Sequence, residues 1–245
     1  MIIDKFLLMS GEDIPLTTSN IVIHHPTLQE LVNVFLYEDN FLTGFEFLFF
    51  SKDKLNEEEQ IILQSLSDFE ILLALLSQSE KSPMKIQLNF LKQFLSLLFN
   101  QYEIKYNEEH IVLNKGKYTY IIDEQLFDDL KIIINQMFPF HRGNKQVDFN
   151  PSSKRAKEIA DKIKKGREKV AKNKAKKEGA ESLFDKYISI LSVGLQIPIK
   201  QLYKNTTYQL FNMFERYEKK ITYDVHLKAQ LAGATGMKDV DHWMM

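Results

Sequence analysis

The chain has 245 residues, 44% of them apolar, which is enough for an ordinary globular core. Its longest apolar runs are well short of the roughly 20 residues that span a bilayer, so we expect no transmembrane helix. Because the sequence contains no cysteine, it excludes disulfides, thiolate metal ligands and cysteine nucleophiles, and it fits a reducing cytoplasm.

The net charge of -1 conceals a strong asymmetry along the chain. Residues 154–177 contain 12 basic and 3 acidic side chains, a net charge of about +9, which leaves about -10 on the remainder. The sequence therefore predicts an acidic body that carries a basic arm.

The first thirty residues combine β-favouring runs with a helix start. Residues 1–10 lack the basic start and long apolar stretch of a secretory signal, and we expect them to form a first strand. Residues 14–23 alternate loosely and include three consecutive β-branched residues, which favours β-structure. Thr27 with Glu30 is a capping-box pattern, so an amphipathic helix is predicted to begin there, with an apolar stripe reaching Leu36.

Three helix signals follow. Residues 41–50 are dense in phenylalanine, and although so short a run also fits a buried strand, we favour a helix. Asn56 precedes three glutamates, and Ser67 precedes the apolar run 69–76, so both are typical of helix N-termini.

A core helix is predicted over residues 83–99, because Ser82 and Pro83 form a favourable helix start. The apolar stripe expected on this helix consists of Ile86, Phe90, Phe94, Leu97 and Leu98.

Three short segments rich in isoleucine, tyrosine and valine come next, at 102–106, 110–113 and 117–122. Their separation by turn residues predicts a small antiparallel meander. Asp123 then caps a helix that ends before Pro139, which closes the N-terminal domain.

The last hundred residues divide into a connector and a helical unit. Residues 143–153 are polar and aperiodic, and residues 154–177 can form a long helix with only a thin apolar line. In the helical unit, a first helix is expected to stop at Gly194. A second, capped by Thr206, is expected to run to Gly233 and pack on the first as a hairpin.

These elements predict an α+β fold in three parts. Residues 1–142 form an N-terminal mixed domain with a small antiparallel meander and packed helices. Residues 143–178 form the polar linker and basic helix, and residues 179–245 form an all-α C-terminal domain.

No catalytic signature is present. The sequence has no phosphate-binding loop, no dinucleotide glycine motif and no nucleophile elbow, and its acidic pairs lie at helix starts, where caps are the commoner role. The six histidines are scattered without metal-ligand spacing, which favours surface or capping positions. We therefore expect no enzyme activity, no catalytic residues, no metal and no cofactor.

The basic arm is the strongest charged feature. Its charge could neutralise several phosphates, but it has no aromatic residue for base stacking, so nucleic acid is the weaker reading. The stronger readings are a solvated connector, or an arm that docks on an acidic partner or on the chain's own body. The basic residues predicted to contact a partner are Lys154, Arg155, Lys157, Lys162, Lys164, Lys165, Arg167 and Lys169.

Aromatic residues supply the other candidates. Most of the C-terminal aromatic stripe must form core, yet Tyr208 and Phe211 are included among the predicted partner contacts. Trp243 follows a glycine-containing loop near the end of the sequence, so it either folds back or inserts into another chain as an anchor.

The C-terminal part resembles a known protein class. The residues that carry the resemblance are 182–195, the aromatic helix 207–217, 223–225, 229–233 and 242–244. Residues 14–16 and 23–28 also resemble the openings of such proteins. The pattern is similar to that of tail-morphogenesis proteins of tailed phages that infect Gram-positive bacteria.

The resemblance implies a chaperone in the host cytoplasm that holds tape-measure or baseplate proteins during tail assembly. Partners would be phage tail proteins, with self-association open and no membrane involved. A permanent tail or baseplate component, located in the virion tail, is the alternative. A nucleic-acid-binding phage protein that uses the basic arm is a third.

Overall fold

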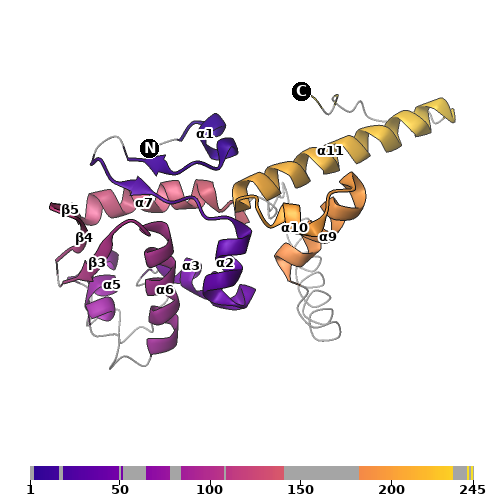
Figure 1. The fold of residues 1–245 in the computed structure, drawn as a ribbon. Coiled ribbons are helices and arrows are strands. Elements are labelled where there is room, and N and C mark those ends of the chain that lie inside the picture. Colours follow the sequence, from indigo (N-terminus) through magenta and orange to yellow (C-terminus); the bar gives the residue numbers. More distant parts are fainter. Residues whose placement is uncertain are drawn as a thin grey trace, which may run out of the picture.

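The protein has an α+β fold, as expected, and is shown as a computed structural model in Figure 1. The structure describes residues 3–16, 19–49, 51, 65–77, 84–107, 109–140, 182–233, 242 and 244. A three-stranded sheet lies at one end of the body and the C-terminal helices lie at the other, with helix α7 (Glu124–Met137) between them (Figure 1).

The N-terminus is a helix, so the strand prediction for residues 1–10 was wrong. Helix α1 spans Lys5–Ser10. The Asp4 carboxylate caps it by accepting a hydrogen bond from the Phe6 N–H at 2.6 Å, and Gly11 ends it in a left-handed conformation with φ 74°. Burial of Leu8 fixes the helix on the body. These local capping interactions outweigh the strand preference of the isoleucines.

The β-structure predicted for residues 14–23 is present at both ends of that run. Strand β1 (Ile14–Pro15) pairs antiparallel with β2 (Val22–Ile23), and Ile14 lies opposite Ile23. Both of these isoleucines are buried, so the short hairpin is held mainly by its apolar face.

Helix α2 (Leu28–Phe35) begins with the predicted capping box between Thr27 and Glu30. Residues 41–50 fall mainly in a helix, as favoured, because α3 (Glu38–Leu48) buries Phe41, Phe45 and Leu48 at helical spacing. Gly44 permits close packing, since a Cβ there would lie 2.6 Å from the Phe90 carbonyl oxygen of the neighbouring helix.

Helices α5 (Asp68–Ser77) and α6 (Lys85–Leu98) match two further predictions, with Ser67 capping the first through the Glu70 N–H. The expected α6 stripe was only partly right, because Ile86 is exposed. Leu88, Leu91 and Leu95 face the core with Phe94 and Leu98, so the buried face is rotated toward α3. The predicted starts at Asn56 and at Ser82–Pro83 lie outside the described residues.

The meander is confirmed. Strands β3 (Glu103–Tyr106), β4 (Ile111–Lys115) and β5 (Tyr118–Ile122) form one antiparallel sheet in that order. Helix α7 (Glu124–Met137) follows, and the Asp123 carboxylate caps it by accepting from the Leu126 N–H at 2.9 Å.

The C-terminal part is the predicted helical hairpin. Helix α9 (Leu183–Leu195) and α10 (Ile199–Leu202) precede the long helix α11 (Thr207–Leu231), which starts with a capping box between Thr206 and Gln209. The α9 and α11 helices pack together through Tyr187, whose ring centroid lies 4.8 Å from that of Phe211.

Two details of this hairpin differ from expectation. Gly194 does not stop α9, which continues to Leu195 and ends at Gln196 in a left-handed conformation. A Cβ at Gly194 would overlap the Tyr217 ring, so the glycine serves helix packing. The apolar stripe of α11 is buried only at its start, because Ile221 and Val225 are exposed where the helix projects from the body (Figure 1).

The two ends of the chain share one core. The ring of Phe184 in α9 lies 6.0 Å from Phe41 and 5.8 Å from Phe140, which follows α7. Thr27 and Thr206 form an isolated antiparallel bridge, so the C-terminal helices join the N-terminal part through backbone as well as side chains. The predicted connector 143–178 lies outside the described residues.

A candidate partner-binding groove

A groove of about 330 Å³ lies where the C-terminal helices meet the N-terminal part. One wall comes from α2 and the start of α3, and the other from α9 and the residue that follows α10. Its buried lining is apolar and includes Leu28, Leu31, Phe41 and Ile188. Such a surface can hold apolar side chains of a ligand.

The rim on the α2 side is a tight turn between two helices. Helix α2 ends when the Leu36 N–H donates to the Val32 carbonyl at 2.9 Å. The Tyr37 N–H then donates to the Phe35 carbonyl at 2.7 Å, which makes Leu36, with φ 61°, the centre of a γ-turn. The Asn40 side chain donates to the same Phe35 carbonyl at 2.9 Å and fixes the turn.

The opposite wall is held by a carboxylate from α3. Glu38 accepts hydrogen bonds from the Leu183 N–H at 2.9 Å, from the Phe184 N–H at 3.4 Å and from the Ser182 hydroxyl. These amides belong to the first turn of α9, which has no partners for them within the helix. Glu38 therefore caps α9 from a different part of the chain.

The groove is electrostatically negative. Burial raises the pKa of the Tyr203 phenol, and the charges of Asp185 and Glu38 raise it further. Asp185 lies in the first turn of α9, exposed at the groove. The arrangement suits an apolar ligand that also carries a positive charge.

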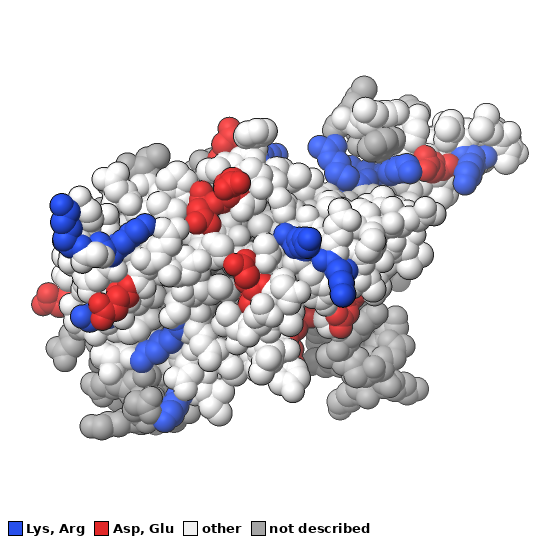
Figure 2. Space-filling model, viewed as in Figure 1, with Lys and Arg blue, Asp and Glu red and all other residues white. Residues whose placement is uncertain are grey.

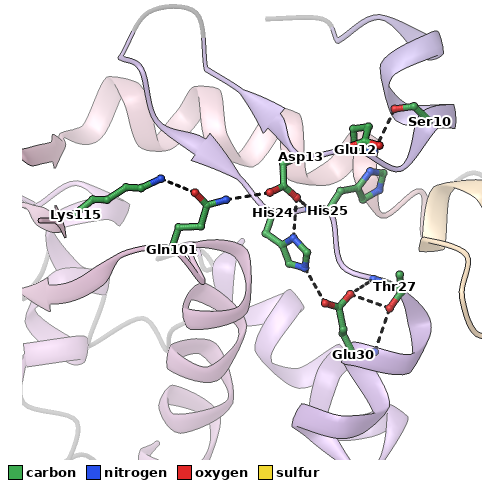
Figure 3. A network of polar contacts seen from close by, with 9 residues as sticks. All are labelled: Ser10, Glu12, Asp13, His24, His25, Thr27, Glu30, Gln101 and Lys115. Atoms are coloured by element: carbon green, nitrogen blue, oxygen red, sulfur yellow. Dashed lines mark hydrogen bonds and ion pairs between the residues drawn. The ribbon is translucent and has the colours of Figure 1, made fainter.

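A separate polar cluster joins the N-terminal hairpin to α2 (Figure 3). The His24 ring lies between two carboxylates, with Nδ1 2.8 Å from Asp13 and Nε2 3.1 Å from Glu30. Asp13 also accepts from the Gln101 amide at 3.1 Å, which in turn accepts from Lys115. Because these side chains hydrogen-bond to one another, the cluster has a structural role and holds the hairpin, α2 and the sheet together.

His25 corrects the expectation that the histidines lie at the surface or in caps. Its side chain is buried, with 2% exposure, and burial lowers its pKa to about 4, helped by His24 and opposed by Asp13.

Burial alone would raise the pKa of Glu30, but hydrogen bonds from Thr27 and the neighbouring His24 outweigh it and lower that pKa.

Residues 173–245 match the family model described as the YomV second domain. The match covers the α9–α11 unit that forms one wall of the groove, and it fits a phage protein. Searches of curated proteins and of solved structures gave no significant match.

Most of the predicted partner contacts lie outside the described residues, namely Lys154, Arg155, Lys157, Lys162, Lys164, Lys165, Arg167, Lys169 and Trp243. Tyr208 and Phe211 are described and belong to the core, with exposures of 2% and 8%. Neither is presented to a partner in this structure, because their rings complete the packing of α11 on the body.

The groove was not predicted. Leu36 was assigned to the buried stripe of α2, and Asp185 and Tyr203 carry no motif of their own. The approach of Glu38 to α9 depends on contacts across the chain, so no local pattern signals it. The turn at Leu36 is held by local hydrogen bonds, but a leucine is not a residue that signals a positive φ.

A second hollow, of about 460 Å³, is lined mainly by residues of α6 together with Val34 of α2. On the face seen in Figure 2, acidic and basic side chains are scattered, except where lysines and arginines gather along the projecting α11 with acidic residues between them. Among the described residues, no group of histidines and carboxylates is placed to hold a metal ion, and no described helix is long and apolar enough to cross a membrane.

Proposed function

We propose that this protein is a non-enzymatic phage assembly factor that binds tail proteins during morphogenesis in the host cytoplasm. Its clients would be tape-measure or baseplate components, held until the tail closes. The observation that carries this proposal is the apolar groove built against the unit that matches the YomV second domain. A groove of this kind can bind a client reversibly without any catalytic group.

The test is mass spectrometry of purified virions beside affinity capture with the tagged protein from cells that are assembling tails. An assembly chaperone is expected to be absent from virions and to capture tape-measure or baseplate proteins. Failure to capture any tail protein under these conditions would contradict the proposal.

The projecting half of α11 favours a second candidate, a permanent tail or baseplate component. Ile221, Val225 and Leu231 are exposed there, and a subunit interface would cover them. This candidate expects the protein in virions at a fixed stoichiometry. A chain truncated after Lys220 should then fold normally but be missing from virions.

A further inference from the structure

Leu36 violates two local preferences at once. A large apolar side chain usually avoids solvent, yet Leu36 is 74% exposed. Its φ of 61° at the centre of a γ-turn favours glycine, so a leucine there holds a strained backbone conformation. Folding of this turn would be served better by glycine or asparagine, so the leucine calls for another reason.

The neighbours of Leu36 make the exposed apolar surface continuous. Tyr37 is 71% exposed and Val32 is also exposed, and all three line the groove beside its buried apolar floor. A single exposed apolar residue is ordinary on a protein surface, but backbone strain concentrates where ligands are held, and here the strained residue lies within a continuous apolar rim.

The charge of the groove indicates what binds. Glu38 is committed to the first amides of α9, which leaves its net negative charge in place. Asp185 adds a second carboxylate at the same wall, and no lysine or arginine is found among the described residues that line the groove. The complementary ligand is apolar on one side and basic beside it.

The backbone of the walls indicates the ligand's conformation. Both walls are helical, so they offer side chains and no strand edge to a partner. An extended segment would leave its own N–H and C=O groups without protein partners in the groove, whereas a helix satisfies them internally.

We propose that this groove docks a basic amphipathic helix of a partner protein, with its apolar side on Leu36 and Tyr37 and a lysine or arginine facing Asp185. This inference rests on the proposed function and specifies the client segment.

The probe is a fluorescein-labelled amphipathic model helix of leucine and lysine, compared with the same helix carrying glutamate for lysine. Fluorescence anisotropy with the full-length protein should show binding of the lysine helix only. Leu36→Gly should weaken it by about tenfold or more. The unfolding midpoint of this variant should stay within about 2 °C or rise, because glycine relieves the strained turn.

The second arm tests the charge. Asp185→Asn should weaken binding several-fold and reduce its dependence on salt, since one ion pair is lost. Phe6→Ala and Glu124→Gln are the matched controls, an exposed apolar residue and an acidic residue that do not line the groove, and neither should change affinity. Leu36→Asn repeats the first arm if the glycine variant folds poorly, because asparagine also tolerates positive φ.

Equal binding of both helices, or unchanged affinity in Leu36→Gly and Leu36→Asn, would overturn the inference. The outcome is separable from that of the proposed function. If tail proteins are captured equally by wild type and Leu36→Gly, the groove assignment fails while the assembly role stands. If the lysine helix binds as described and no tail protein is captured, the assembly role fails instead.

Discussion

At the scale of single residues, Gly194 shows how one missing methyl group permits the C-terminal hairpin. Alanine is the better helix former by about 1 kcal/mol, so Gly194→Ala would be stabilising in an isolated helix. Here its Cβ would overlap the Tyr217 ring, and we expect a net loss of about 1–3 kcal/mol.

Thermal unfolding followed by circular dichroism measures this loss. In a Tyr217→Ala background the obstacle is gone, and Gly194→Ala should then be neutral or stabilising. A higher unfolding midpoint for the single variant would show that the Tyr217 ring moves aside at no cost.

His25 predicts a pH dependence of stability. Burial lowers its pKa to about 4 in the folded protein, from the usual 6.5 that it has in the unfolded chain, so between these values the unfolded chain binds more protons. The stability gained by keeping His25 neutral is complete above pH 6.5 and is lost as the pH falls toward 4. The free energy of unfolding should fall by about 3 kcal/mol in total over this range.

Urea unfolding at pH 7, 6 and 5 checks this prediction. The His25→Gln variant should lose the slope in this window, and Glu30 does not contribute to it, because a carboxylate with a lowered pKa loses its stabilising effect only below the usual 4.5. Identical slopes in wild type and variant would assign the dependence to other groups.

At the scale of elements, some helix caps can be predicted from a short stretch of sequence and others cannot. Thr27 with Glu30, Asp123 and Thr206 were predicted as caps because each interaction spans three residues. The Glu38 cap of α9 joins residues 145 positions apart, so no sequence window contains it. The same limit explains the rotated stripe of α6, whose buried face depends on where α3 packs.

Loss of the Glu38 cap should loosen the start of α9 specifically. Glu38→Gln removes the charge that faces these amides, and we expect a cost of about 1–2 kcal/mol. Amide hydrogen exchange should accelerate at residues 183–187 and change little in α7. Asp39→Asn, an exposed acidic residue in the same first turn of α3, is the control, and an equal effect there would point to the α3 helix dipole instead.

At the scale of the whole molecule, the α+β class, the meander and the C-terminal hairpin followed from periodicity and turn chemistry. The joining of the two ends into one core did not, because the ring contacts of Phe184 with Phe41 and Phe140 connect distant segments. The groove could not be predicted from the sequence for the same reason, because its two walls come from those same distant segments.

Because the two parts share one core, we expect the stability of the N-terminal part to depend on the C-terminal helices. A chain ending at Phe140 would expose Phe41 and Phe140 where Phe184 and Phe211 now pack. We expect a lower unfolding midpoint than that of the full chain and binding of a hydrophobic dye, measured by calorimetry and fluorescence. A truncated protein with an unchanged midpoint and no dye binding would show two independent cores.

The Glu38 cap also bears on how the chain is made. A ribosome delivers α3 long before α9, so the capping carboxylate already exists when the amides of Leu183 and Phe184 emerge. The last helices can then pack on an N-terminal part that has already been synthesised. In a circular permutant that places α9 before α3, the ribosome would deliver α9 with only its local Ser182 cap, so co-translational folding of this unit should be delayed even though the finished molecule has the same contacts.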